Sequence, residues 1–322
     1  MSNDEELPSE TKEPIILDEQ APVTEEQFQY LEERAGVSPE ILIPKKNVII
    51  DSQIFTTIMG CGRLTDFRFN HHFVSIKGKS KSLEMGSIVH TFLETFNKAI
   101  ISGQFRSTAI DLALAAAKQY ANSNEVRNTS VTDRDWAIKT CEMYIDFRKT
   151  DTWVPLEVEK VKGKVIYEDD EVRILWKSKF DLIADTQHGI LPVDYKSMSQ
   201  RRDTHSLNNQ FTGQCVVQGT SKMIIEKIGF QTSLEPKDKF QRILMPFSAD
   251  RIKEWQQEIV PYWVKIMLAY AESGYWPPNF THCETKYGFC DFIKTCEADR
   301  ILRASELRDS FVVGEPWDVT ND

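Results

Sequence analysis

Hydrophobic and polar residues along the chain point first to residues 179–197, where two short apolar runs flank a break at 186–189. A glycine-containing break between two such runs predicts a β-hairpin. A four-residue loop would place Asp181 opposite Asp194, whereas a two-residue turn would place it opposite Lys196. Since side chains alternate along a strand, both registers leave these three residues on one face. We expect the rest of the chain to be organised around this hairpin.

Apolar positions at helical spacing indicate helices both before and after the hairpin. Helices are expected at 24–34, 52–61, 82–96, 107–121, 131–148, 207–227 and 249–273. Further strands are expected at 156–167, 172–176 and 240–247. Strands and helices in this order predict an α/β fold with a central mixed sheet flanked by helices and a helical N-terminal portion.

The distribution of charge keeps nucleic acid open as a partner. The net charge is −10, but residues 1–40 alone carry −10 and residues 301–322 carry −3, so the segment between them is about +3. Residues 1–24 are acidic and rich in proline, which predicts a disordered tail. No apolar run suits a membrane span and no secretory pattern opens the chain, so we expect a cytoplasmic protein with no membrane partner.

The hairpin carboxylates suggest metal chemistry. Opposed Cβ atoms in a β-pair lie about 5 Å apart, and two carboxylates that close repel each other unless a cation lies between them. Two carboxylates suit Mg²⁺ or Mn²⁺, and Lys196 would stand beside whatever the metal binds. The common alternative for such an Asp and Lys pair is a solvated ion pair. The apolar residues around Asp181 and Asp194 favour the metal site, because buried charges need a partner.

Three cysteines near the C-terminus, Cys283, Cys290 and Cys296, form a second candidate site. Without a secretory signal they are expected to be thiols or metal ligands rather than disulfides. Three ligands leave a tetrahedral or cubane site one short, and free thiols in a loop are the alternative. The spacing does not choose among the candidates for a fourth ligand, which are Cys61, His282, Cys215 and Cys141.

Several motifs together resemble the PD-(D/E)XK nuclease superfamily, in its RecB-like exonuclease branch, which is often phage-encoded. The matching segments are Cys61-Gly-Arg63, Gly86-Ser-Ile-Val-His90, Lys179-Phe-Asp181-Leu-Ile, Val193-Asp194-Tyr-Lys196-Ser and Asn209-Gln210-Phe-Thr-Gly-Gln214. They follow the order of the family's motifs across most of the chain. Two positions depart from the pattern: a tyrosine is usual where Gln214 stands, and Cys61 lacks the proline that commonly follows it.

The resemblance implies a restriction-endonuclease-like core at residues 25–305, with a cysteine knuckle at 283–296 and an acidic C-terminal tail at 306–322. It implies that Mg²⁺ or Mn²⁺ is held by His90, Asp181, Asp194 and the carbonyl of Tyr195. From the residues alone, His90 would be read as a packed structural histidine. Lys196 and Gln210 complete the implied catalytic set, and Glu159 is a weaker candidate for an outer contact of the metal.

For the cysteines, the resemblance implies a [4Fe–4S] cluster, with zinc or no metal as alternatives. Its ligands would be Cys61, Cys283, Cys290 and Cys296. The implied activity is metal-dependent hydrolysis of DNA, by an exonuclease rather than an endonuclease. It would serve phage or bacterial DNA recombination, repair or replication in the bacterial or infected host cytoplasm. A recombination or single-strand-binding protein is an expected partner. The alternative is a catalytically inactive nucleic-acid-binding or structural component of a DNA-processing complex.

Overall fold

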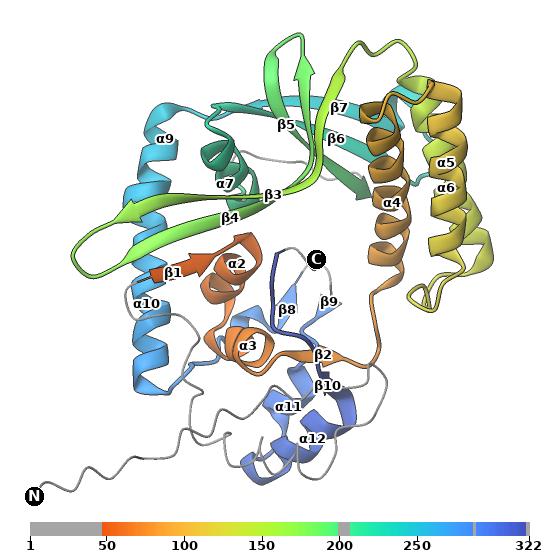
Figure 1. The fold of residues 1–322 in the computed structure, drawn as a ribbon. Helices are drawn as coiled ribbons and strands as arrows, with labels where there is room; N and C mark the ends of the chain where they lie inside the picture. The colour runs from red at the N-terminus through yellow and green to blue at the C-terminus, as the bar shows by residue number, and fades with distance from the viewer. Residues whose placement is uncertain (1–46, 199–206, 286–287, 320–322) are drawn as a thin grey trace, which may run out of the picture.

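A computed structural model describes residues 47–198, 207–285 and 288–319, and its centre is a six-stranded mixed sheet (Figure 1). Five strands follow the order β1-β4-β5-β6-β7 with β3 along the other edge of β4, so the sheet branches at β4. The strands are β1 (Asn47–Ile50), β3 (Val154–Glu168), β4 (Arg173–Thr186), β5 (Gly189–Met198), β6 (Lys222–Gly229) and β7 (Phe240–Pro246). The expected tail at 1–24 and helix at 24–34 lie outside the described residues.

The predicted hairpin is formed by β4 and β5. Its strands are antiparallel, with Thr186 paired to Gly189 and Leu182 paired to Val193. The hairpin is therefore confirmed, and of the two expected registers the structure has the one that places Asp181 and Asp194 at the next position of each strand, although the turn contains two residues rather than four. Beyond the hairpin, β5 runs parallel to β6, which gives the sheet its mixed character.

Three helices cover one face of the sheet: α4 (Lys81–Ile101), α5 (Arg106–Ala121) and α6 (Val131–Phe147). The predictions at 82–96, 107–121 and 131–148 are therefore confirmed. In α5 the buried residues are alanines at every fourth position, Ala109, Ala113, Ala117 and Ala121. Side chains this small allow the α5 backbone to approach α4 closely, and the four alanines share one hydrophobic core with α4 and the sheet.

Helices α2 (Ser52–Gly60), α7 (Asn209–Gln218), α9 (Ala249–Glu254) and α10 (Val260–Ser273) pack around a second core. A π-helical turn at Trp255–Ile259 joins α9 to α10, so the long helix predicted at 249–273 is confirmed. Trp255 is fully buried there, with its ring edge-on to Trp176 of β4 at 4.7 Å. No described helix is both long and apolar enough to cross a bilayer.

The predicted helix at 207–227 is wrong in its second half. Helix α7 ends at Gly219, whose φ of 75° is a left-handed helix cap that glycine adopts without strain. The following apolar run belongs to β6, in which residues 223–229 are all buried. A short, β-branched run buried on both faces suits an internal strand, and periodicity alone cannot distinguish it from a buried helix.

A smaller C-terminal region packs beside α3 (Gly62–Thr65) and a π-helical turn at Asp66–Asn70. Its elements are η3 (Phe280–His282), β8 (Glu284–Thr285), β9 (Gly288–Phe289), α11 (Ile293–Glu297), η4 (Arg300–Leu302), α12 (Arg303–Ser310) and β10 (Phe311–Val313). Strand β10 pairs with β2 (Phe73–Ser75), and the short helix α8 (Pro236–Lys239) precedes β7. Residues 306–319, expected to be a tail, thus contain regular structure. Trp317 even donates to Asp51, the cap of α2, at 2.6 Å.

Candidate active site

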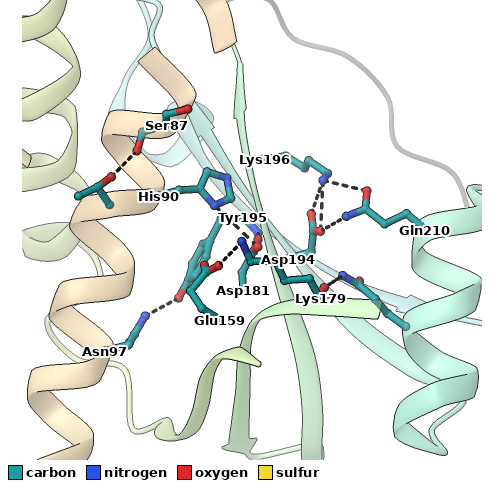
Figure 2. A network of polar contacts seen from close by, with 12 residues as sticks. Ser87, His90, Asn97, Glu159, Lys179, Asp181, Asp194, Tyr195, Lys196 and Gln210 are labelled. Carbon is teal, nitrogen blue, oxygen red and sulfur yellow. Dashed lines mark hydrogen bonds and ion pairs between the residues drawn. The ribbon is translucent and has the colours of Figure 1, made fainter. Parts of the chain in front are cut away.

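The centre of the site is the point where the β4–β5 ladder ends. The last rung joins Leu182 to Val193. Beyond it, the backbone N–H of Tyr195 donates to Asp181 Oδ2 at 2.8 Å (Figure 2). A side-chain carboxylate thereby takes the place of a ladder partner, and Asp181 is fixed between the two strands.

Asp194 lies on β5 in a compact polar group with Lys196 and Gln210. Lys196 Nζ lies 2.9 Å from Asp194 Oδ2 and 3.2 Å from Oδ1, and it also lies 3.2 Å from Gln210 Oε1. Gln210 Nε2 donates to Asp194 Oδ1 at 3.0 Å. Asp194 is fully buried, and its Oδ2 accepts no hydrogen bond but is paired with the Lys196 ammonium. A metal ion bound at Asp194 would share this oxygen with the lysine.

The N-terminal end of α7 positions Gln210. The Asn208 side chain caps this helix by accepting the backbone N–H groups of Gln210 and Phe211. One turn later, Gln214 Nε2 donates to the backbone carbonyl of Lys179 at 3.0 Å. Gln214, where the family usually has tyrosine, therefore braces β4 rather than contacting the carboxylates.

Helix α4 presents two polar residues to the hairpin, two turns apart. His90 Nδ1 lies 3.7 Å from Asp181 Oδ1, and Asn97 Nδ2 donates to the Tyr195 hydroxyl at 3.3 Å (Figure 2). Asn97 and Tyr195 are both buried. Sequence reasoning missed Asn97, although a polar residue seven positions after His90 on the apolar face of a helix was a usable signal.

Strand β3 contributes Glu159 to the same place. Its backbone has φ +50°, in the left-handed region that non-glycine residues rarely adopt. It stands between the rungs Val158–Leu182 and Lys160–Phe180, and its carboxylate lies 3.0 Å from Lys179 Nζ. One ligand atom each from His90, Glu159 and Asp181 lies within 4.8 Å of the other two. The sequence had suggested only an outer role for Glu159.

The acids of this group repel each other electrostatically. Burial raises the pKa of the Asp181 carboxyl above its usual value and the nearby Asp194 carboxylate raises it further, although His90 opposes both effects. Burial likewise raises the pKa of Glu159, and Asp181 adds to that rise. A site that disfavours its own negative charges gains from a bound cation, and carboxylates with one imidazole suit Mg²⁺ or Mn²⁺.

The structure also brings four of the six cysteines together. A small cavity in the C-terminal region is lined by Cys61, Cys283, Cys290, Cys296 and His282, among others. The two remaining cysteines, Cys141 and Cys215, are buried in other parts of the core. The candidates for a fourth ligand therefore narrow to Cys61 and His282.

Polar groups of the backbone and of Arg63 surround these sulfur atoms. The backbone N–H of Asn279 donates to Cys61 Sγ at 3.3 Å, and Arg63 Nη1 lies 3.6 Å from Cys296 Sγ. Burial raises the pKa of the Cys283 thiol, and the neighbouring Cys296 and Cys61 raise it further. Donors aimed at sulfur stabilise thiolates, which is the form that binds metal.

Comparison with known families identifies the superfamily of the chain. The family model of the PD-(D/E)XK nuclease superfamily matches residues 66–297, which contain both carboxylates, Lys196 and the cysteine trio. The chain belongs to this superfamily. The α/β fold with its mixed central sheet agrees with the restriction-endonuclease-like core expected of a PD-(D/E)XK nuclease.

Two solved structures are similar to this PD-(D/E)XK chain at low identity. A protein of Eubacterium rectale named "Putative exonuclease" is 12% identical, with a TM-score of 0.46, 94% of this chain covered and 98% of that one. The protein SSO0001 is 10% identical, with a TM-score of 0.29, 61% of this chain covered and 86% of that one. No curated protein matches the chain.

Proposed function

We propose that this PD-(D/E)XK nuclease hydrolyses phosphodiester bonds of DNA in a reaction that depends on a divalent metal ion. The observation that carries the proposal is the fully buried Asp194, which is held by Lys196 and Gln210 beside Asp181. Burying a carboxylate next to a second acid costs folding free energy, and a role in binding metal accounts for keeping that arrangement.

Mg²⁺ or Mn²⁺ would be held by Asp181, Asp194, His90 and the carbonyl of Tyr195. When bound, the metal supplies positive charge to the phosphate and lowers the pKa of a coordinated water. The residues fit such an ion in part: His90 and Asp181 offer ligand atoms within 4.8 Å of each other, and burial raises the pKa of the Asp181 carboxyl. Asp194 lies outside that group, with its buried Oδ2 in an ion pair with Lys196, which a metal ion would share. An imidazole ligand favours Mn²⁺ over Mg²⁺.

Lys196 would act on the reacting groups directly. Its side chain is about one third exposed, so it can reach a phosphate while it stays paired with Asp194. There it would orient the attacking water and stabilise the charge that develops on the phosphate oxygens. Gln210 holds Lys196 and Asp194 through opposite ends of one amide, and would keep the lysine aimed at the substrate.

The finer assignment is an exonuclease acting in phage or bacterial DNA recombination, repair or replication. It rests on the resemblance of the motif series to the RecB-like branch. DNA would be the substrate, a recombination or single-strand-binding protein would be a partner, and the cytoplasm would be the location. We propose residue 25 as the start of the domain on the same basis, and place its end beyond 305, because β10 pairs with β2.

For the cysteine cavity we propose a [4Fe–4S] cluster held by Cys61, Cys283, Cys290 and Cys296. The proposal is supported by the four cysteines that line one cavity and by the resemblance of the motif series, which implies a cluster rather than a single zinc ion.

Incubation of the purified protein with linear and with circular DNA tests the activity. We expect degradation of linear DNA with Mn²⁺ or Mg²⁺ and none with EDTA, while closed circular DNA stays intact. The matched Asp194→Asn protein, purified in the same way, should be inactive. Cutting of circular DNA would show that the protein is an endonuclease rather than an exonuclease. Binding of DNA without cutting under any metal would favour the inactive DNA-binding alternative.

A further inference from the structure

Glu159 and Lys179 form an ion pair at the edge of the site that the proposed reaction does not use. Their charged atoms lie 3.0 Å apart, and both side chains are largely buried. Glu159 is one of only two non-glycine residues with positive φ in the described chain. In Figure 2 its carboxylate lies beside His90 and Asp181 rather than out on the surface of the strand.

The position of the pair is what distinguishes it from an ordinary ion pair. The Glu159 carboxylate, the His90 ring and the Asp181 carboxylate each offer an atom within 4.8 Å of the others. Lys179 places a positive charge on one member of this group, Glu159. The protein therefore already pairs an ammonium with one of the three side chains that a metal ion would bind.

We propose that Glu159 is a further ligand of the metal ion and that Lys179 is a built-in counter-ion which gives up this carboxylate when the metal binds. The inference rests on the proposed metal-dependent function and adds a ligand to that site. It also predicts competition: the ammonium and the divalent ion claim the same carboxylate, and each disfavours the other through charge repulsion.

The competition gives the two residues effects of opposite sign on metal affinity. Titration of the DNA-free protein with Mn²⁺, followed by calorimetry or by the loss of free Mn²⁺ signal in electron paramagnetic resonance, measures this directly. Glu159→Gln should weaken binding about 10-fold or more, as loss of a metal contact commonly does. Lys179→Met should tighten binding several-fold. If the pair were merely structural, the two variants would leave affinity unchanged or shift it in the same direction.

Strand β3 supplies a matched control pair. Lys162 Nζ lies 2.6 Å from Glu157 Oε1 on the same strand, and neither residue belongs to the group around Asp181. Glu157→Gln and Lys162→Met should leave Mn²⁺ affinity unchanged. Glu159→Gly is a second test, because glycine adopts φ +50° freely. It should keep the fold and still lose affinity.

The outcomes separate this inference from the function on which it rests. If Mn²⁺ binds the wild-type protein, is lost in Asp181→Asn and is unchanged in Glu159→Gln, then Glu159 is not a ligand and the nuclease proposal stands. If the wild-type protein binds no Mn²⁺ at all, both proposals fail. Weaker binding in Glu159→Gln with tighter binding in Lys179→Met supports both.

Discussion

Asp181 accepts the backbone N–H of Tyr195 at 2.8 Å, across the gap where β4 and β5 stop pairing. The contact fixes one acid of the site to the backbone that follows the other acid, Asp194. Tyr195 is in turn held at its hydroxyl by Asn97 of α4. The spacing of the two carboxylates therefore depends on the end of a hairpin and on a helix, and both belong to the same hydrophobic core.

Lys196 should be indispensable for hydrolysis. Lys196→Ala removes the only described ammonium that contacts Asp194, so we expect release of nucleotides from linear DNA to fall at least about 100-fold. The protein should remain folded by circular dichroism. Lys98→Ala, which removes an exposed ion pair with Glu94 on α4, is the control and should be fully active. Wild-type turnover in a contaminant-free Lys196→Ala preparation would falsify the nuclease assignment.

His90 should contribute to metal binding. His90→Ala is expected to weaken Mn²⁺ affinity about 10-fold or more, and the loss of activity should shrink as Mn²⁺ is raised. His188→Ala, in the exposed turn of the hairpin, should change neither property. A His90→Ala protein that melts earlier but titrates Mn²⁺ normally would show a packed structural histidine instead.

Asn97 should contribute to the free energy of unfolding, because its side chain hydrogen-bonds to Tyr195 beside the site. Asn97→Ala leaves the buried Tyr195 hydroxyl without this donor, which costs about 1–3 kcal/mol of the free energy of unfolding. Urea denaturation measures the change. Asn122→Ala is the control, because Asn122 is exposed at the end of α5, and it should cost less than about 0.5 kcal/mol. Equal unfolding free energies for the two variants would mean that the Asn97–Tyr195 contact contributes nothing.

Serine substitutions should separate the cysteines into two classes. Protein purified without oxygen is expected to be brown and to contain iron and sulfide. Serine at Cys61, Cys283, Cys290 or Cys296 should bleach it and lower its solubility, because a structural metal site contributes folding free energy. Cys141→Ser and Cys215→Ser should stay coloured. If zinc were the sole metal found, the cysteine metal site would stand and the iron–sulfur cluster would be ruled out. An unaffected Cys61→Ser would make His282 the fourth ligand.

In metal-free protein, a thiol reagent should label the cavity cysteines faster than Cys141 and Cys215. Burial raises the pKa of Cys215 to about 12 and the pKa of Cys141 still further. At pH 8 the fraction of Cys215 present as the reactive thiolate is then about one part in 10⁴, whereas an ordinary thiol is about a tenth or more ionised. Labelling should become faster as pH rises toward that pKa. Mass spectrometry should find label first on the cavity cysteines; early label on Cys215 would contradict its burial.

The sequence predicted the hairpin well because two independent constraints agreed. Apolar runs marked β4 and β5, and the break between them set a register with few alternatives. The helices α4 to α6 were also predicted, since their apolar positions repeat over four or more turns. The 207–227 segment failed where β6 is buried on both faces, because such a strand has no polar face to reveal its period.

The sequence predicted the site residues that lie within one local motif and missed those that tertiary packing brings to it. Asp181, Asp194 and Lys196 come from one hairpin, so their proximity follows from pairing alone. Glu159 depends on a left-handed backbone within β3, and Asn97 depends on the seating of α4. Those contacts are set by tertiary packing, and a single sequence carries only weak signals of it.

The hydrogen bond from Trp317 to Asp51 ties the acidic C-terminal segment to the start of helix α2. Asp51 uses one oxygen to cap α2 and the other to accept from the indole. Helix α2 leads at its far end directly to Cys61. A gene shortened to remove residues 314–322 as dispensable would therefore loosen the helix that carries a cysteine of the cavity. Affinity tags are better appended beyond residue 322 than substituted for these last residues.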